Sequence, residues 1–488
     1  MTVPVLCGLA AAFLLLAGSY VHGSIAWLAA APLVLARCGH SWRRAGALGL
    51  ACAVTVAVGG EAHWVGVAGE RYFGLPGWKA AALVAVLALG AGLTYGLVLG
   101  AILRCTTGLR PGWTIIAVGA GWSAWESLTT TAFPYYPWAS LAATQAWAPV
   151  LLQVASVTGQ GGLSFAMAAA GACLGLALRD RGDRRLRRQR ALGAAAIVLA
   201  VTAFGWTRMH APRPASAPTC PLSAVDARIR SGQLPRDRLL RRYRAMTRRA
   251  ARSRPAVIVW PESALPGYLE RDGALQEEMR RLAASARAAL IAGGPRVDWS
   301  GRWQQRVFNS AYLVGGDGPL QVYDKRQLVP FAEYWPRALG RRPQALQADE
   351  VQPGKSAGVF VAAGCRLGVL ICFETEQPRL ARELALSDAQ ALLVLSNDAQ
   401  LPARAIANEL AQARLRAVET GLPVVRAANR GASVVIDRYG AIVRGPRHHV
   451  LTADVGKPAP ALAVRVAPAF DWMCWVTVVL AAWVGRRG

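Results

Sequence analysis

The 488-residue sequence has few charged side chains. Asp, Glu, Lys and Arg make up 17% of it, against about 25% in a typical soluble protein. Hydrophobic residues reach 54%, which is too much apolar surface for a disordered chain and makes a purely soluble protein unexpected. Cysteine is also scarce, with nine residues, so a disulfide-dense scaffold is excluded. We therefore expect a folded chain that is partly embedded in a membrane.

Acidic residues and lysine are scarce as well. Against 55 Lys and Arg there are only 28 Asp and Glu, a formal net charge of +27. Four of the cations are lysines, at Lys79, Lys325, Lys355 and Lys457. A basic chain invites a nucleic-acid interpretation, but much of this charge sits in short arginine clusters between apolar segments. We therefore expect no nucleic-acid partner.

Apolar stretches separated by short polar breaks fill the first 206 residues. The candidate spans are 4–18, 24–36, 45–60, 79–103, 112–128, 149–178 and 191–206, and a last one at 469–485 closes the chain. Several are shorter than the roughly 20 residues that cross a bilayer, so flanking residues must complete them. No cleavable signal is evident, because the first four residues carry no basic side chain. We predict a transmembrane bundle of about seven spans at 1–206 and a C-terminal transmembrane helix at 469–488.

Arginine placement predicts the orientation. The breaks after the second, fourth and sixth segments are arginine-rich, with seven arginines between Arg179 and Arg190. The alternate breaks hold one Arg (61–78) and no Lys or Arg (129–148). The arginine-rich breaks are thus expected in the cytoplasm, and residues 207–468 outside it. This outer region begins with a proline-rich stretch, APRPASAPTCP, that is typical of an extended spacer.

Residues 207–468 are enough for one α/β domain. Short β-branched apolar runs alternate with helical stretches rich in Arg, Ala and Leu, a pattern that favours a layered α/β fold with buried strands. The runs are 256–260, 289–294, 309–315, 366–372, 391–396, 423–428 and 433–437, and the helical stretches are 236–252, 274–288, 376–386 and 403–420.

Reactive side chains follow several of these runs. Functional groups in α/β sheets gather just past the carboxyl ends of strands. Glu262 follows the run at 256–260, and Cys372 and Glu374 stand at the end of the run at 366–372. Between them, Lys325 and Glu333 lie in QVYDKRQLVPFAEYWP, a segment rich in Pro and aromatic residues.

Cys372 has two interpretations. A cysteine that ends an apolar strand is usually an inert buried hydrophobe. Near a base and a cation it becomes a nucleophile. Glu262 could be that base, or simply a helix cap. Lys325 could stabilise an oxyanion, and a lysine in a chain that otherwise uses arginine favours a compact ammonium over a chance surface position.

Other reactive patterns are absent. The sequence has no CxxC or HExxH spacing, no GxSxG turn and no Walker loop, so we expect neither metal nor cofactor. The adjacent His448 and His449 are expected to have no function. Cys220 could pair with Cys365, but the sequence does not decide this.

Three motifs, in chain order, carry a resemblance: WPESALP, YDKRQLVPFAEYWP and LGVLICFE. They resemble the carbon–nitrogen hydrolase (nitrilase) superfamily, and YDKRQLVPFAEYWP is similar to its apolipoprotein N-acyltransferase branch in particular. Segments 63–78, 133–142 and 153–165 are similar to that branch too. The resemblance implies an αββα sandwich at 207–468, outside the cytoplasm of a bacterial inner membrane.

The resemblance also implies residue roles. Glu262 corresponds to the general base, Lys325 to the oxyanion-stabilising lysine and Cys372 to the nucleophile. Glu333, Asn309 and Glu374 correspond to supporting active-site residues.

The implied reaction moves an acyl chain from a membrane phospholipid, through a Cys372 thioester, to the N-terminal amine of a lipid-modified protein. Three departures from the family pattern stand out: Phe373 replaces Tyr, Gln400 replaces Trp, and Asn408-Glu409 replace Gln-His. They keep an alternative open, an amidase or acyltransferase of a conjugal-transfer or secretion system with another acceptor.

Overall fold

The computed structural model describes most of the chain, in two compact units, Met1–Pro212 with Leu462–Gly488, and Arg213–Ala461. The described residues are 2–36, 41–59, 70, 76–105, 109–131, 140–180, 182–211, 220–226, 228–229, 234–299, 305–315, 318–330, 332–335, 350–399, 401–444, 450–456 and 460–485. The core of the predicted spacer (212–219), Gln400 and the His448–His449 pair lie outside them.

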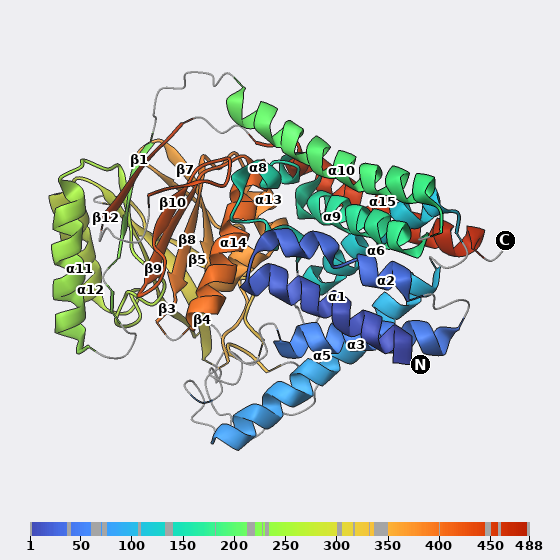
Figure 1. Ribbon diagram of the computed structural model, residues 1–488. Coiled ribbons are helices and arrows are strands. Elements are labelled where there is room, and N and C mark those ends of the chain that lie inside the picture. Colours follow the sequence, from blue (N-terminus) through green and yellow to red (C-terminus); the bar gives the residue numbers. More distant parts are fainter. Residues whose placement is uncertain are drawn as a thin grey trace. The chain divides into compact units, whose positions relative to one another are not determined.

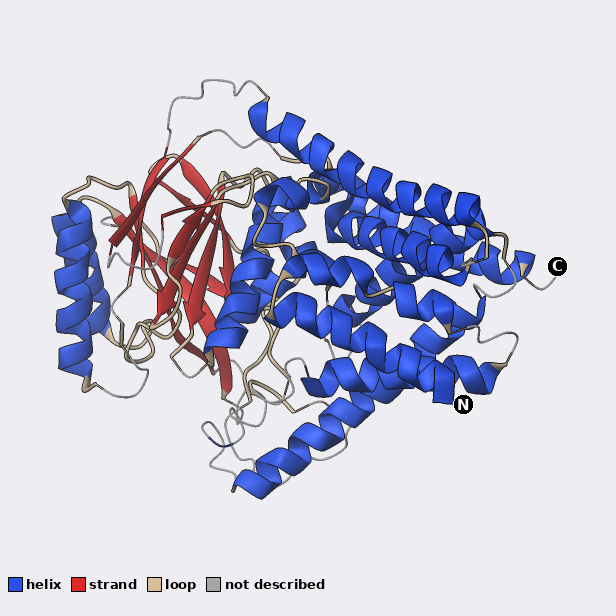
Figure 2. Cartoon of the chain, in the orientation of Figure 1, coloured by secondary structure: helices blue, strands red, loops and turns tan. Residues whose placement is uncertain are grey.

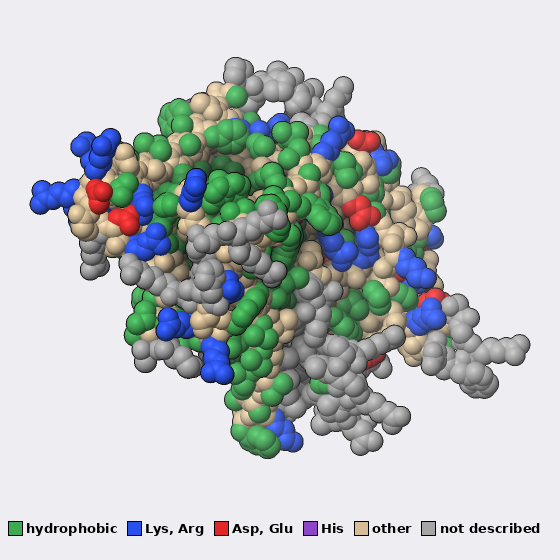
Figure 3. Space-filling model, turned by 90° about the vertical axis from the view of Figure 1, so that its right-hand side faces the viewer, with side chains coloured by type: hydrophobic (Ala, Val, Ile, Leu, Met, Phe, Trp, Pro, Cys, Tyr) green, Lys and Arg blue, Asp and Glu red, His purple; other side chains and the backbone are tan. Residues whose placement is uncertain are grey.

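The first unit is helical (Figures 1 and 2). Its elements are α1 (Thr2–Tyr20), η1 (Gly23–Leu28), α2 (Ala31–Leu35), α3 (Trp42–Gly59), α5 (Gly77–Cys105), α6 (Pro111–Thr131), α7 (Leu141–Thr144), α8 (Pro149–Leu152), α9 (Ala155–Arg179), α10 (Arg184–His210) and α15 (Ala463–Val484). Among the described residues, five helices are long and apolar enough to cross a membrane: α1, α5, α9, α10 and α15. Hydrophobic side chains cover wide areas of the face drawn in Figure 3. Such a surface suits contact with lipid rather than water.

Two predicted spans are interrupted. The segment at 24–36 forms η1 and α2, which are short pieces rather than one long helix. The segment at 149–178 divides into α8 and α9, and α9 itself bends at Gly159, whose φ is 70°. Proline at the start of α2 disfavours helix in the residues just before it, and Gly159 permits the bend in α9. The number of membrane crossings stays a prediction.

The second unit contains two six-stranded sheets. The first sheet has the order β12-β1-β2-β3-β4-β5, and the second has β11-β10-β9-β8-β7-β6. The strands of the first are β1 (Cys220–Val225), β2 (Val257–Val259), β3 (Ala289–Asp298), β4 (Arg306–Val314), β5 (Gln321–Asp324) and β12 (Val450–Val455). Those of the second are β6 (Val359–Ala362), β7 (Cys365–Ile371), β8 (Ala391–Asn397), β9 (Val424–Asn429), β10 (Val434–Ile436) and β11 (Ile442–Arg444).

Helices cover the outer faces of the sheets to give an αββα sandwich. In Figure 1, α11 (Arg236–Ala251) and α12 (Gly273–Ala286) lie on one side of the strands, and α13 (Pro378–Leu386) and α14 (Ala403–Thr420) on the other. One hydrophobic core fills the space between the sheets, with Val259 and Ile291 meeting Val369 and Leu393. A second core lies under α11 and α12. The predicted α/β domain is confirmed.

Each of the seven apolar runs overlaps one strand. β8 shows why they are recognisable: it pairs in parallel with both β7 and β9. A strand buried on both faces by such neighbours needs a continuous apolar sequence, and ALLVLS supplies one. Helix ends follow the expected chemistry too, since the Asp272 carboxylate caps α12 by accepting from Leu275 N at 2.9 Å.

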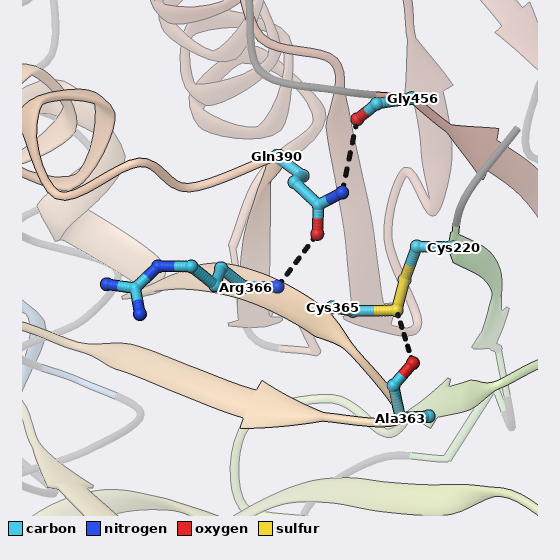
Figure 4. Close-up of a disulfide and its surroundings, with 6 residues drawn as sticks. All are labelled: Cys220, Ala363, Cys365, Arg366, Gln390 and Gly456. Carbon is cyan, nitrogen blue, oxygen red and sulfur yellow. Dashed lines mark hydrogen bonds between the residues drawn. A yellow bond between two sulfur atoms is a disulfide. The ribbon is translucent and has the colours of Figure 1, made fainter. Parts of the chain in front are cut away.

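A disulfide joins the two sheets. Cys220 at the start of β1 is bonded to Cys365 at the start of β7, across 145 residues of sequence (Figure 4). The sequence left this pairing open. The bond fixes β7 against β1 at the end of β7 opposite Cys372.

Candidate active site

One half of the candidate site comes from the first sheet. Glu262 follows β2, Asn309 lies in β4 and Lys325 directly follows β5. β4 and β5 pair antiparallel, and Lys325 N donates to Asn309 O at 2.8 Å, so the two side chains are neighbours. Gly293 in β3 lets the Glu262 loop approach, because a Cβ there would lie 2.6 Å from the Glu262 Cα.

These side chains form a cluster that we call the lysine centre: Lys325, Glu262, Glu333 and Asn309. The Lys325 ammonium is 2.9 Å from Glu333 Oε1 and 3.9 Å from Glu262 Oε1. The Asn309 amide donates to both carboxylates, at 2.7 Å to Glu262 and 2.9 Å to Glu333. Glu333 also accepts from Val329 N at 2.8 Å, which holds its loop. The structure thus brings four of the six predicted residues into one hydrogen-bonded group.

Burial and charge set the protonation of the lysine centre. Burial raises the pKa of Glu262, Lys325 opposes that rise, and Glu333 adds to it. For Lys325, burial lowers the pKa, but Glu333, Glu262 and Cys372 outweigh burial and raise it overall. Lys325 therefore stays an ammonium although it is only 1% exposed. A buried cation can stabilise negative charge that develops beside it.

The other half of the site comes from the second sheet. Cys372 follows β7 as the first residue of η5 (Cys372–Glu376). Its φ is 51°, in the left-handed region that side-chain-bearing residues seldom occupy. The turn after Glu262 contains a similar residue, Ser263, with φ 55°. Both predicted reactive groups therefore lie next to strained turns at strand ends.

Cys372 is electrostatically coupled to the lysine centre. Burial raises the pKa of the thiol well above 9.0, Glu262 and Glu409 raise it further, and Lys325 lowers it. The resting sulfur is therefore a thiol, and a nearby base is required to make it a nucleophile. The thiol lies 3.8 Å from Glu409 Oε1, an acceptor that was not among the predicted site residues.

Glu374 joins the two halves. Its buried carboxylate accepts from Tyr323 Oη on β5 at 2.8 Å and from Arg326 N, next to Lys325, at 2.7 Å. It also accepts from Ile371 N, next to Cys372, at 2.8 Å. Burial raises the Glu374 pKa and these hydrogen bonds oppose the rise. Glu374 thus positions the lysine loop against the cysteine turn from outside the reacting group.

Sequence reasoning missed a second charged cluster, which we call the arginine centre: Arg426, Asp398, Glu409 and Ser396. Arg426 in β9 binds Asp398 through two hydrogen bonds, of 2.7 and 2.8 Å, and also donates to Glu409 Oε2. Ser396 Oγ donates to Asp398 at 2.7 Å. A signal was present: Arg426 interrupts the apolar run PVVRAA, and an arginine in a buried strand needs a carboxylate partner.

The described residues offer a thiol, a buried ammonium and two carboxylates, Glu262 and Glu409, whose charge acts on the sulfur. They contain no group of three or more His, Cys, Asp or Glu side chains arranged to hold a metal ion. The set that is present fits acyl transfer through a covalent intermediate, in which a base frees the thiol and a cation stabilises the tetrahedral oxyanion.

Each of the two units contains a region that matches a known protein family. Residues 225–455 match the model of the carbon-nitrogen hydrolase family. Residues 9–173 match the apolipoprotein N-acyltransferase N-terminal domain. Among solved structures, a mutant of the Nesterenkonia AN1 amidase from the nitrilase superfamily is similar, with 22% identity and a TM-score of 0.40, covering 54% of this chain and 98% of the amidase. The chain is an enzyme of the carbon–nitrogen hydrolase superfamily with a helical membrane bundle.

Curated relatives narrow the class. An apolipoprotein N-acyltransferase from Geobacter metallireducens is 29% identical over 95% of this chain and 91% of its own length. Another, from Azotobacter vinelandii, is 30% identical over 76% of this chain and 73% of its own length. The chain belongs to the apolipoprotein N-acyltransferase family.

Proposed function

We propose that this protein is an N-acyltransferase that moves an acyl chain from a membrane phospholipid to the N-terminal amine of a lipid-modified protein. The observation that carries the proposal is the Lys325 ammonium, buried between Glu262 and Glu333 and coupled to the Cys372 sulfur. The names of the relatives indicate the reaction class.

The proposed reaction has two half-reactions. Glu262 takes the Cys372 proton, and the sulfur attacks the ester carbonyl of the donor while Lys325 stabilises the oxyanion. The lysophospholipid alkoxide leaves with the proton from Glu262, and the acyl group remains on sulfur as a thioester. The amine of the acceptor then attacks the thioester. Its proton passes to Glu262 and on to the departing sulfur, giving an amide and the free thiol.

We place the catalytic domain on the outer side of a bacterial inner membrane. Arginine-rich breaks on the other side of the spans support this. The Cys220–Cys365 disulfide supports it independently, since such bonds persist in oxidising compartments. A membrane-anchored site also meets lipid-anchored substrates in two dimensions, which raises their effective concentration.

The test of the reaction is a trapped intermediate. Purified protein is incubated with phospholipid that carries a labelled acyl chain, then denatured and treated with hydroxylamine. We expect a labelled, hydroxylamine-sensitive adduct on the wild type and none on Cys372→Ala. A wild type without label, or equal labelling of Cys372→Ala, contradicts the proposal.

The test of orientation uses two reporter cysteines and a membrane-impermeant maleimide. Ala245→Cys is exposed on α11, and Arg187→Cys is exposed in the arginine-rich segment. On intact spheroplasts we expect labelling at position 245 alone, and at position 187 only after permeabilisation. The reverse pattern would place the catalytic domain in the cytoplasm.

The alternative, a different acceptor, was suggested by the replacements at Phe373, Gln400 and Asn408-Glu409. The relatives named above give no support to a conjugal-transfer role. An acyltransferase with another acceptor differs from the proposed function in the second half-reaction alone, so a trapped acyl-enzyme that fails to acylate a diacylglyceryl-modified peptide would favour it. An amidase would differ in the first half-reaction too, and would form no adduct from phospholipid.

A further inference from the structure

Glu409 is the buried carboxylate in contact with the proposed nucleophile. It comes from α14, which packs against η5, the element that begins with Cys372. One oxygen, Oε1, lies 3.8 Å from the Cys372 sulfur, and the other accepts from Arg426 and from Ser396. Hydrogen bonds to Oε2 therefore hold the Glu409 carboxylate in place, with Oε1 facing the thiol.

We propose that Glu409 is a second carboxylate of this active site, which accepts the hydrogen bond of the resting Cys372 thiol and opposes formation of the thiolate by like charge. The inference rests on the proposed role of Cys372 as nucleophile and deepens it. Glu409 controls when the sulfur becomes reactive, whereas Glu262 removes its proton during the reaction.

The surroundings give Glu409 a charge that depends on pH. Burial raises its pKa to about 7, Asp398 and Glu262 add to the rise, and Arg426 opposes it. These groups, with the thiol itself, are the charges that face Glu409: Asp398 after β8, Arg426 on β9, Glu262 after β2 and Cys372 on η5. Below about pH 7 the neutral carboxyl leaves the sulfur unopposed, and above it the charged carboxylate disfavours the thiolate.

Glu409→Gln isolates this charge. The amide keeps the shape, and Arg426 keeps both hydrogen bonds to Asp398 and one to Ser396, so the arginine stays paired. The detergent-solubilised full chain is treated with iodoacetamide, a neutral reagent, between pH 6 and 8.5. Alkylation of the Cys372 peptide is then followed by mass spectrometry.

We expect Glu409→Gln and the wild type to react at equal rates at pH 6. At pH 8.5 we expect the variant to react about threefold faster or more. A thiol pKa lowered by one unit gives about tenfold more thiolate, and the lower nucleophilicity of that thiolate takes back part of the gain. Glu409→Asp keeps the charge and should stay near the wild-type rate. Glu277→Gln, an exposed α12 carboxylate paired with Arg281, should match the wild type throughout.

Other outcomes overturn the inference. Equal rates at every pH would show that the charge does not act on the sulfur, and a slower Gln variant would make Glu409 the base that frees the thiol. If the Gln variant does not fold, the wild type alone decides. The logarithm of its alkylation rate, plotted against pH, should rise with a slope below one around pH 7. A slope of one from pH 6 to 8.5 contradicts the inference. Because alkylation uses no lipid, loss of the acyl adduct with this pH pattern intact would sink the proposed reaction alone.

Discussion

The two charged centres of this domain have a similar arrangement of charges but differ in how tightly their hydrogen bonds hold the cation. Each holds one buried cation between two carboxylates, Lys325 between Glu262 and Glu333, and Arg426 between Asp398 and Glu409. The guanidinium grips Asp398 with two parallel hydrogen bonds, a geometry that fixes both partners. The ammonium makes one short contact and one of 3.9 Å, so its remaining donors can turn toward a new oxyanion. The contacts of the arginine centre therefore fix its geometry more tightly than those of the lysine centre, and under the proposed reaction this leaves the Lys325 ammonium able to turn toward the substrate.

Exchanging the cation of the lysine centre tests this contrast most strongly. In Lys325→Arg the charge remains, but a larger, planar guanidinium replaces the compact ammonium of a residue that is only 1% exposed. We expect acyl transfer to fall about hundredfold or more, the loss seen when one oxyanion donor is removed, with little change in thermal unfolding. Lys355→Arg, at an exposed position, is the matched control. Near-normal turnover in Lys325→Arg would remove the role given to the ammonium.

Breaking the disulfide tests how much it stabilises the domain by holding together the two sheets that carry the two centres. The bond joins β1 of the first sheet to β7 of the second and closes a long loop, with a sequence separation of 145. Replacing Cys220 and Cys365 by serine should lower the free energy of unfolding by about 2–5 kcal/mol. Wild type unfolded in a reducing agent should show the same decrease. An unchanged midpoint in both experiments would mean that the bond does not constrain the domain.

How much of the fold and of the candidate site could be predicted depends on whether the residues concerned lie in or next to a recognisable apolar run. Glu262 and Cys372 follow apolar runs that the sequence marks clearly, and strand ends converge in an α/β sheet. β1, β5, β6, β11 and β12 were missed. Four of these, β5, β6, β11 and β12, are the edge strands of the two sheets, where a strand needs a less continuous apolar sequence than one buried between neighbours. Only β1 was missed away from an edge.

The arginine centre could not be assembled from spacing at all. Asp398 and Glu409 lie 28 and 17 residues before Arg426, and they meet it because β8 and β9 pair in parallel with α14 packed against them. That register is a property of the folded sheet. The sequence signal was limited to Arg426, one charged residue in an otherwise apolar strand.

Exchanging the cation of the arginine centre should lower the stability of the domain more than it lowers the rate of acyl transfer. Arg426→Lys keeps the charge and loses the paired hydrogen bonds to Asp398, as well as those to Ser396 and Ala432 O. We expect the free energy of unfolding to fall by about 2–4 kcal/mol, somewhat less than the roughly 3–5 kcal/mol for a buried pair that loses one charge, because the lysine keeps the charge. Residual turnover per folded molecule should decrease less than in Lys325→Arg. Arg242→Lys, exposed on α11, is the control, and a wild-type midpoint for Arg426→Lys would contradict the tighter hold attributed to the arginine centre.

The smallest expected effect is on the pH dependence of stability, in which the Glu409 carboxyl and the Lys325 ammonium should differ. The folded-state pKa of Glu409, about 7, lies above its ordinary value of 4.5. The stability that this shift contributes is therefore fully present below pH 4.5 and is lost as pH rises through about 7. Glu409→Gln removes that loss. Between pH 5 and 8 the free energy of unfolding of the wild type should fall by about 1–3 kcal/mol relative to the variant.

The lysine cation should show no such slope in this range. The Lys325 pKa is raised above 10.5, so the stability from this shift is constant below that pH and is lost only in strong alkali. Thermal unfolding of the full chain in detergent from pH 5 to 8, with Glu277→Gln as the control, measures the difference. A pH-independent gap between wild type and Glu409→Gln would show that Glu409 carries the same charge throughout, because a group that does not titrate in this range cannot make stability depend on pH.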